Sequence, residues 1–439
     1  SGDNIFMGYD AGGGTWADAA SNENVGIGNY VMDAAMNGAL YNTALGHEAL
    51  SALTTGDENT VVGNEAGLAI TTGAYNTLFG YRAGKGVTTG FGNTVVGREA
   101  MDSSTTTLQE NTIIGYSAAG NGSFDADKTV IIGALAGHSG AMTSAADGTI
   151  AIGYQAGYVI TSGAGNTFIG HAGGKTTTTG YQNTTLGYQA LFQNVVGYGN
   201  VAVGYQASMY VTSSQNVAIG LEAGKGNSSA PYISGEANIS IGAYTNHDLT
   251  TGKRNVSIGG NAGHTMDTGT DNTLLGNNAG SNVKDAVGST IIGGYAGRYA
   301  SGSKNTFIGY GTGDGATSSA PFSSGQYNTA VGAEAFDVFT TGNYNVAMGY
   351  QALDNQTSGN NCIAIGNNAA GGSYGVDNVI GIGAYAAHNG LAAGTIAIGY
   401  YAGYYSQQGY NTFVGYESGK GTGAAGYTRS TGLGYQAIK

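Results

Sequence analysis

The sequence predicts an all-β fold, a parallel β-solenoid in the form of a flattened β-roll, with about 25 coils of ~17 residues. Three observations support this prediction. Glycine makes up 82 of the 439 residues, charged residues are only 9 %, and a short motif ending in glycine recurs along the whole chain. We call this glycine the anchor glycine; it stands at 8, 28, 46, 63, 80, 97, 115, 133, 153, 170, 187, 204, 220, 242, 259, 276, 293, 309, 332, 349, 366, 383, 399, 415 and 434. Residues 1–439 therefore form a single repeat domain in this prediction.

The spacing selects the repeat class, and the composition excludes other classes. Twelve of the 24 intervals are 17 residues, which is shorter than the units of helical or leucine-rich arrays. Hydrophobic residues are 41 %, too many for a disordered chain. A formal charge of −13 with 14 Lys and Arg predicts no nucleic-acid partner. No apolar run approaches the ~20 residues of a membrane span, so we also expect no membrane insertion.

The three residues before each anchor glycine predict a strand. The first is always Ile, Val or Thr and the third is always apolar, as in Thr60 and Val62, an alternation that marks a strand with one buried face. The residue between them points the other way, yet it is charged in no copy. We therefore expect both faces to be covered, one by the coil interior and one by an identical chain, which predicts a homo-oligomer.

The motif also predicts structural roles for its polar and small residues. Asn opens it in 18 of 25 copies, and stacked Asn side chains are expected to form a hydrogen-bonded ladder. Ala follows the anchor glycine by three positions in 20 copies, which indicates a site for small side chains. The residues chosen to represent these roles are Asn59, Gly63, Ala66, Asn216, Gly220 and Ala223.

A second turn is predicted ten residues after the anchor glycine, where Gly follows Thr-Thr or Thr-Ser. Each coil is thus expected to hold two short strands and two glycine turns. The two longest intervals contain the chain's only prolines, Pro231 and Pro321, within near-copies of one insert. We expect these inserts to protrude as surface loops at 227–236 and 317–326.

Candidate ligand contacts are aromatic. Tyr follows the anchor glycine in 11 coils, and its ring can stabilise a roll or stack on a sugar face. The candidates are Tyr154, Tyr188 and Tyr205 in this column and Tyr232 and Phe322 in the inserts. Glu recurs at repeat positions such as Glu65, which suits a solvated column better than a unique acid pair. The sequence predicts no catalytic residue, no metal site and no cofactor.

The residues quoted above resemble known repeats. The chain is similar to the Asn-Thr-Ala-x-Gly-Tyr-Gln-Ala repeats of phage tail fibres and bacterial surface fibres, often found upstream of an endosialidase-type chaperone domain. It also resembles the head repeats of trimeric autotransporter adhesins, whose Ser-Val-Ala-Ile-Gly core is echoed by Asn216-Val217-Ala218-Ile219-Gly220. The resemblance covers 1–439 and implies a homotrimer of left-handed β-rolls in an extracellular location, either a virion tail fibre or a bacterial cell-surface appendage.

Three functions follow as expectations. The first is a non-enzymatic, trimeric shaft, on the order of 115 Å long at ~4.8 Å per coil, which presents a tip for attachment to a host or surface. The alternative is an adhesin that binds cell-surface glycans through the tyrosine columns or the insert loops. The third is an ice-binding solenoid, suggested by the Thr pairs at 54–55, 71–72 and 88–89, although this column breaks at 103–107.

Overall fold

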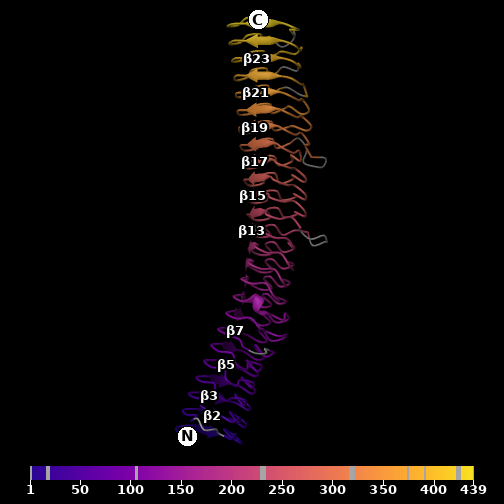
Figure 1. Ribbon diagram of the computed structural model, residues 1–439. Coiled ribbons are helices and arrows are strands. Elements are labelled where there is room, and N and C mark those ends of the chain that lie inside the picture. The colour runs from indigo at the N-terminus through magenta and orange to yellow at the C-terminus, as the bar shows by residue number, and fades with distance from the viewer. Residues whose placement is uncertain are drawn as a thin grey trace. The chain divides into compact units, whose positions relative to one another are not determined.

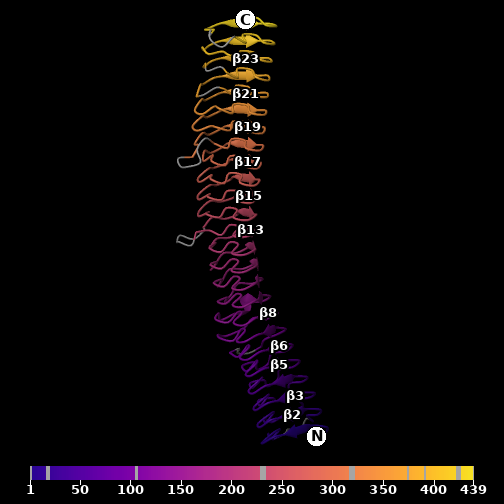
Figure 2. The same cartoon turned by 180° about the vertical axis from the view of Figure 1, so that it is seen from behind.

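The computed structural model describes residues 2–15, 20–103, 107–227, 234–315, 322–372, 375–389, 392–421 and 427–438. It divides into two compact units, residues 1–215 and 216–439. In both units the described residues form stacked coils, and each coil contributes one three-residue strand that lies on one side of the stack (Figures 1 and 2). The fold is thus an all-β parallel solenoid, as predicted.

Every strand ends at the residue before an anchor glycine. The first unit holds β1 (Ile5–Met7), β2 (Val25–Ile27), β3 (Thr43–Leu45), β4 (Thr60–Val62), β5 (Thr77–Phe79), β6 (Thr94–Val96), β7 (Thr112–Ile114), β8 (Val130–Ile132), β9 (Ile150–Ile152), β10 (Thr167–Ile169), β11 (Thr184–Leu186) and β12 (Val201–Val203), with one 3₁₀ turn, η1 (Ser144–Ala146). The second unit holds β13 (Val217–Ile219), β14 (Ile239–Ile241), β15 (Val256–Ile258), β16 (Thr273–Leu275), β17 (Thr290–Ile292), β18 (Thr306–Ile308), β19 (Thr329–Val331), β20 (Val346–Met348), β21 (Ile363–Ile365), β22 (Ile380–Ile382), β23 (Ile396–Ile398), β24 (Thr412–Val414) and β25 (Thr431–Leu433).

Within each unit, consecutive strands pair in parallel and in the register of the repeat. Val61 lies opposite Leu78, for example, one coil further along the chain. The inserts do not shift this register, because Val217 still pairs with Ile239 and Thr306 with Thr329. The predicted loops at 227–236 and 317–326 fall largely on 228–233 and 316–321, which lie outside the described residues.

The predicted second strand of each coil does not form. Around the Thr-Thr-Gly turn the described residues show only isolated bridges, such as Phe91 with Gln109 and Thr270 with Val287. The coils still bond to one another there: the Thr54 amide and hydroxyl both donate to the Thr71 carbonyl, at 2.9 and 3.0 Å. The bonding pattern differs from that of a strand, because the consecutive amides of Thr54 and Thr55 both donate to the Thr71 carbonyl, at 2.9 and 3.2 Å, whereas a parallel ladder uses alternate residues.

The face of the strand that is buried is the opposite of the one expected. We call the residue two before the anchor glycine the core column, and the residue one before it the outer column. Core-column residues such as Val61 and Phe168 are completely buried. Outer-column residues are partly or well exposed on the described surface: Val62 and Val96 are partly exposed, Phe79 is 56 % exposed and Leu186 is 52 % exposed. The predicted alternation is confirmed, but the first and third strand residues, such as Thr60 and Val62, point outward, and the middle residue points into the core.

The predicted structural residues lie where the repeat requires them. Asn59 is fully buried; its Nδ2 donates to Asn42 Oδ1 and to the Gly73 carbonyl, both at 2.9 Å. Asn76 continues the ladder with Nδ2 at 3.0 Å from Asn59 Oδ1. In the second unit Asn216 Oδ1 accepts from the Asn238 amide at 3.0 Å. Ala66 and Ala223 are fully buried, and Gly63 and Gly220 have φ values of +143° and +136°. The Asn ladder is therefore confirmed.

Candidate functional site

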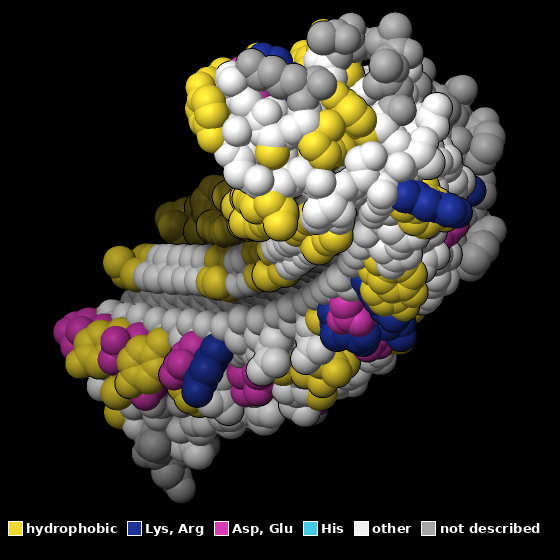
Figure 3. Space-filling view, turned by 90° about the horizontal axis from the view of Figure 1, so that it is seen from above, with side chains coloured by type: hydrophobic (Ala, Val, Ile, Leu, Met, Phe, Trp, Pro, Cys, Tyr) yellow, Lys and Arg dark blue, Asp and Glu magenta, His cyan; other side chains and the backbone are white. Residues whose placement is uncertain are grey.

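The outer column is an extended apolar surface in both units. Its members keep large apolar side chains in solvent at the exposed strand face; the clearest are Met7, Ile27, Leu45, Phe79, Ile114 and Leu186 in the first unit and Ile219, Leu275, Ile308, Met348, Ile365, Ile398 and Leu433 in the second. Figure 3 shows hydrophobic side chains at the surface next to charged ones that gather in patches. A soluble monomer rarely leaves so many large apolar residues exposed at adjacent positions.

The predicted tyrosine contacts of the first unit form one stack. His171 completes it: its ring lies 5.1 Å from Tyr154 and 4.9 Å from Tyr188, and Tyr188 lies 5.3 Å from Tyr205. The Tyr188 and Tyr205 planes differ by only 8°, so these rings face one another. Each tyrosine is nonetheless 42–47 % exposed. Such a stack contributes to coil stability, whereas stacking on a sugar requires a free ring face.

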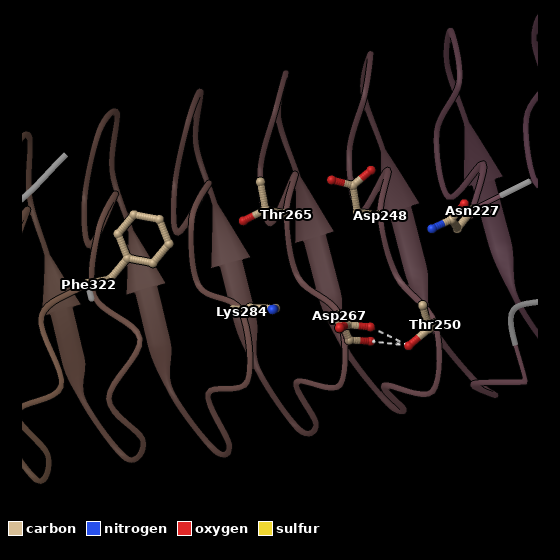
Figure 4. Close-up of a pocket in the computed structure, with 7 residues that line it drawn as sticks. All are labelled: Asn227, Asp248, Thr250, Thr265, Asp267, Lys284 and Phe322. Atoms are coloured by element: carbon tan, nitrogen blue, oxygen red, sulfur yellow. Dashed lines mark hydrogen bonds between the residues drawn. The ribbon is translucent and has the colours of Figure 1, made fainter. Parts of the chain in front are cut away.

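Of the two insert aromatics, only Phe322 lies within the described residues. Tyr232 lies outside the described residues. Phe322 is half-buried and its ring stacks on Tyr299 at 6.1 Å. It lies at one end of a groove with a cavity volume of about 380 Å³, and Asn227 lies at the other end (Figure 4). The groove therefore runs across the coils that separate the two inserts.

Polar side chains line this groove between its two ends. Thr250 and Asp267, on consecutive coils, are joined by a hydrogen bond that the Thr250 hydroxyl donates (Figure 4). Asp248 accepts a hydrogen bond from His247 Nδ1 at 2.7 Å, which lowers the pKa of Asp248 and raises that of His247. Thr265 and Lys284 complete the lining. Carboxylates, hydroxyls and one aromatic ring suit a ligand rich in hydroxyl groups.

The recurring glutamates are engaged with neighbouring coils. Glu65 accepts from Arg82 Nε at 3.0 Å and from Lys85 Nζ at 2.6 Å, and these partners lower its pKa. Glu222 lies 3.0 Å from Lys225 and 3.1 Å from His247. Each carboxylate repeats a local pattern, so none stands out as a unique general acid. Among the described residues no three His, Cys, Asp or Glu side chains are grouped so that they could hold a metal ion.

A second cleft was not anticipated from the sequence. It lies in the second unit, has a volume of about 330 Å³, and opens where Gly311 follows an anchor glycine by two positions. Tyr295 and Tyr310 form its aromatic wall, and Glu334 and Asp337 contribute carboxylates. The available signal was in the repeat itself, because Gly311 is the one glycine at this position in 25 coils.

No family model and no curated protein matches this chain. None of the helical turns in the described part of the chain is long and apolar enough to cross a membrane. The class that the fold defines is a parallel β-solenoid repeat protein.

Proposed function

We propose that the chain is a non-enzymatic structural segment of an extracellular fibre, a homotrimer that holds an attachment tip away from a virion or a bacterial cell. The exposed outer column carries this proposal. Burying one Leu or Phe side chain contributes ~1.5–3 kcal/mol, and a second copy of the same chain offers the same column at the same coil spacing. Shared burial along many coils would thus make assembly favourable, in the left-handed trimer that the resemblance implies.

The mass of the protein in solution tests this proposal. Light scattering at micromolar concentration should give about three times the chain mass of 43.9 kDa. A mass of 43.9 kDa at all concentrations would contradict the proposal, because the outer column would then be stable in water without a partner. A dimer or tetramer would retain the interface but overturn the trimer.

A second candidate is glycan binding, favoured by the groove between Asn227 and Phe322. Its hydroxyl and carboxylate groups can bond vicinal hydroxyls, and Phe322 adds an apolar platform. A glycan array probed with the wild-type protein and with Phe322→Ala tests it, with Tyr188→Ala as the control from the stacked column. Binding that is lost only in Phe322→Ala would support the groove; equal signals in all three proteins would exclude it.

The ice-binding alternative receives less support from the geometry. Ice recognition needs a flat array of free hydroxyls, whereas Thr54, Thr71 and Thr161 donate their hydroxyls to backbone carbonyls of the next coil. Absence of thermal hysteresis is the result we expect.

A further inference from the structure

The coil of Gly311 lacks a surface side chain that the other 24 coils possess. The backbone does not demand glycine there: Gly311 has φ +61°, and Glu334 and Gln351 adopt φ +54° and +51° at the equivalent position. A Cβ atom on Gly311 would have Glu334 Cγ at 3.7 Å as its nearest neighbour, an ordinary van der Waals contact. The missing side chain therefore leaves an open gap between neighbouring coils.

Two tyrosine rings wall this gap. Tyr295 and Tyr310 lie 5.8 Å apart with their planes at 73°, so they form an aromatic corner. Such ring faces attract cations, and this wall already holds one, because the Arg298 guanidinium lies 5.1 Å from the centroid of Tyr295. Arg298 also lines the cleft and is paired within the chain, since its Nε and Nη2 donate to the two oxygens of Asp314 at 3.1 and 2.6 Å.

The opposite side of the gap carries two carboxylates, Glu334 and Asp337, that form no ion pair with a described residue. Glu334 accepts only neutral hydrogen bonds, including one from Gln351 Nε2 at 2.8 Å. The carboxylate of Asp337 has no hydrogen-bond or ion-pair partner within the described ranges, and the residue is half-buried. Two carboxylates facing an aromatic corner match a cation whose hydrocarbon part can contact rings. They do not match a bare metal ion, for which the described residues offer no ligand group.

We propose that the cleft at Gly311 binds the ammonium group of a small organic amine, with the cation between Glu334 and Asp337 and its alkyl part against Tyr295 and Tyr310. An amino sugar and a lysine side chain both present this chemistry. The proposal does not depend on the oligomeric state, because every contact comes from one chain and one unit.

The affinity of this cleft for an amine should depend on pH, because Asp337 titrates in it. The pKa of Asp337 is raised to about 6, first by burial and then by the negative charges of Asp314, Glu334 and Asp354. The positive charge of Arg298 acts in the opposite direction but is the smaller effect. A bound cation favours the ionised form. Affinity for the amine should therefore rise between pH 5 and pH 7, and binding near pH 6 should release protons.

Ligand-observed saturation-transfer NMR with n-butylammonium chloride tests the site, with n-butanol as the neutral probe. We expect binding of the amine, no comparable binding of the alcohol, and a loss of at least about five-fold in affinity at pH 5 relative to pH 7. Gly311→Gln restores the residue that the repeat uses at Gln351 and should abolish the signal by filling the gap. Ala172→Gln makes a similar change at the equivalent position of the first unit and should leave it intact.

Asp337→Asn and Glu334→Gln remove charge without filling the gap, so they keep the test valid if Gly311→Gln misfolds. Each should weaken amine binding at pH 7, and Asp337→Asn should remove most of the pH dependence. Equal binding by wild type and Gly311→Gln, or equal binding of n-butanol, would overturn the proposal. Glucosamine and lysine amide, compared as competitors, then distinguish a sugar source from a peptide source.

Discussion

The Phe168 ring fills the space in the solenoid core that a side chain on Gly174 would need. A Cβ atom on Gly174 would lie 2.4 Å from Cδ1 of the Phe168 ring, and Phe168 is completely buried. The same relationship links Phe307 with Gly313, where the distance would be 2.6 Å. Gly174 and Gly313 each follow an anchor glycine by four positions. In a third coil the sizes are reversed: the core-column residue is Ala347, the residue four after the anchor glycine is Leu353, and both are buried. In these three coils a large side chain at one position accompanies a small one at the other.

This exchange predicts a compensating pair of substitutions. Gly174→Leu should destabilise the first unit by at least about 3 kcal/mol, because a close-packed core cannot absorb the overlap. Phe168→Ala should cost about 3–5 kcal/mol through the cavity it leaves. The double variant copies the natural Ala347 and Leu353 combination and should recover most of the loss in urea denaturation. Additive losses in the double variant would show that the two positions do not share space.

The buried ladder predicts graded effects at Asn59. Asn59→Ala removes two donated hydrogen bonds and leaves the Gly73 carbonyl and the Asn76 amide without a buried partner, at about 1–3 kcal/mol for each unsatisfied group. Asn59→Thr should cost less, because Thr129 replaces Asn in this column and its hydroxyl donates to Asn111 Oδ1 at 2.7 Å. Hydrogen exchange should be fastest in Asn59→Ala and confined to nearby coils. Identical exchange in all three proteins would contradict a stabilising ladder.

The repeat could be predicted from the sequence because its strongest signals are steric. Anchor glycines have φ values that other residues avoid, so their positions located every strand in the described chain. The direction of the strand faces could not be predicted from alternation, since both faces are apolar. The buried face is identified by the size exchange between Phe168 and Gly174. This exchange appears only when the two positions are compared within one coil.

The candidate site was predictable only in part. Phe322 does line a groove, but that groove is completed by residues such as Asp267 and Lys284, which come from separate coils and share no motif. The tyrosine column could be located from the repeat. Its ring orientation could not, because mutual stacking depends on the coil spacing that brings Tyr188 and Tyr205 to 5.3 Å.

The outer column predicts that charge will prevent assembly. Phe79→Glu combined with Leu186→Glu places two carboxylates on the exposed strand face, where burial against another chain would desolvate them. Light scattering should show the mass falling toward 43.9 kDa while circular dichroism stays unchanged. Thr55→Glu with Thr179→Glu adds the same charge at exposed positions away from the strands and should leave assembly intact. An intact oligomer in the first variant would place the interface elsewhere.

The raised pKa of Asp337 predicts that its contribution to the free energy of unfolding decreases as the pH rises. Its pKa is raised from 3.8 to about 6 in the folded chain, first by burial and then by Asp314, Glu334 and Asp354. The folded state therefore holds this proton more tightly than the unfolded state, so the contribution is complete below pH 3.8 and is lost as the pH rises through 6. After a discount for solvent screening it amounts to on the order of 1 kcal/mol.

The difference between wild type and Asp337→Asn isolates this contribution, because carboxylates with lowered pKa values, such as Glu65 and Asp271, act in the opposite direction in both proteins. Thermal unfolding from pH 4 to pH 8 should show the wild type losing stability relative to Asp337→Asn across pH 4–7. Parallel curves would show that Asp337 titrates at its ordinary pKa.

The anchor glycines predict the most severe single substitution. Gly63 has φ +143°, and a Cβ atom there would lie 2.2 Å from the Gly80 carbonyl oxygen, which is backbone and cannot move without separating the coils. Gly63→Ala should therefore cost more than about 4 kcal/mol, in the range reserved for disruptive changes. Gly165→Ala is the matched control: φ is +63° and the nearest atom is Gln182 Cγ at 3.9 Å, so only about 1–2 kcal/mol of left-handed strain is expected. Limited proteolysis should cut Gly63→Ala near its substituted coil and spare Gly165→Ala. Equal resistance of the two variants would mean that the coils can separate at an anchor glycine without loss of the stack.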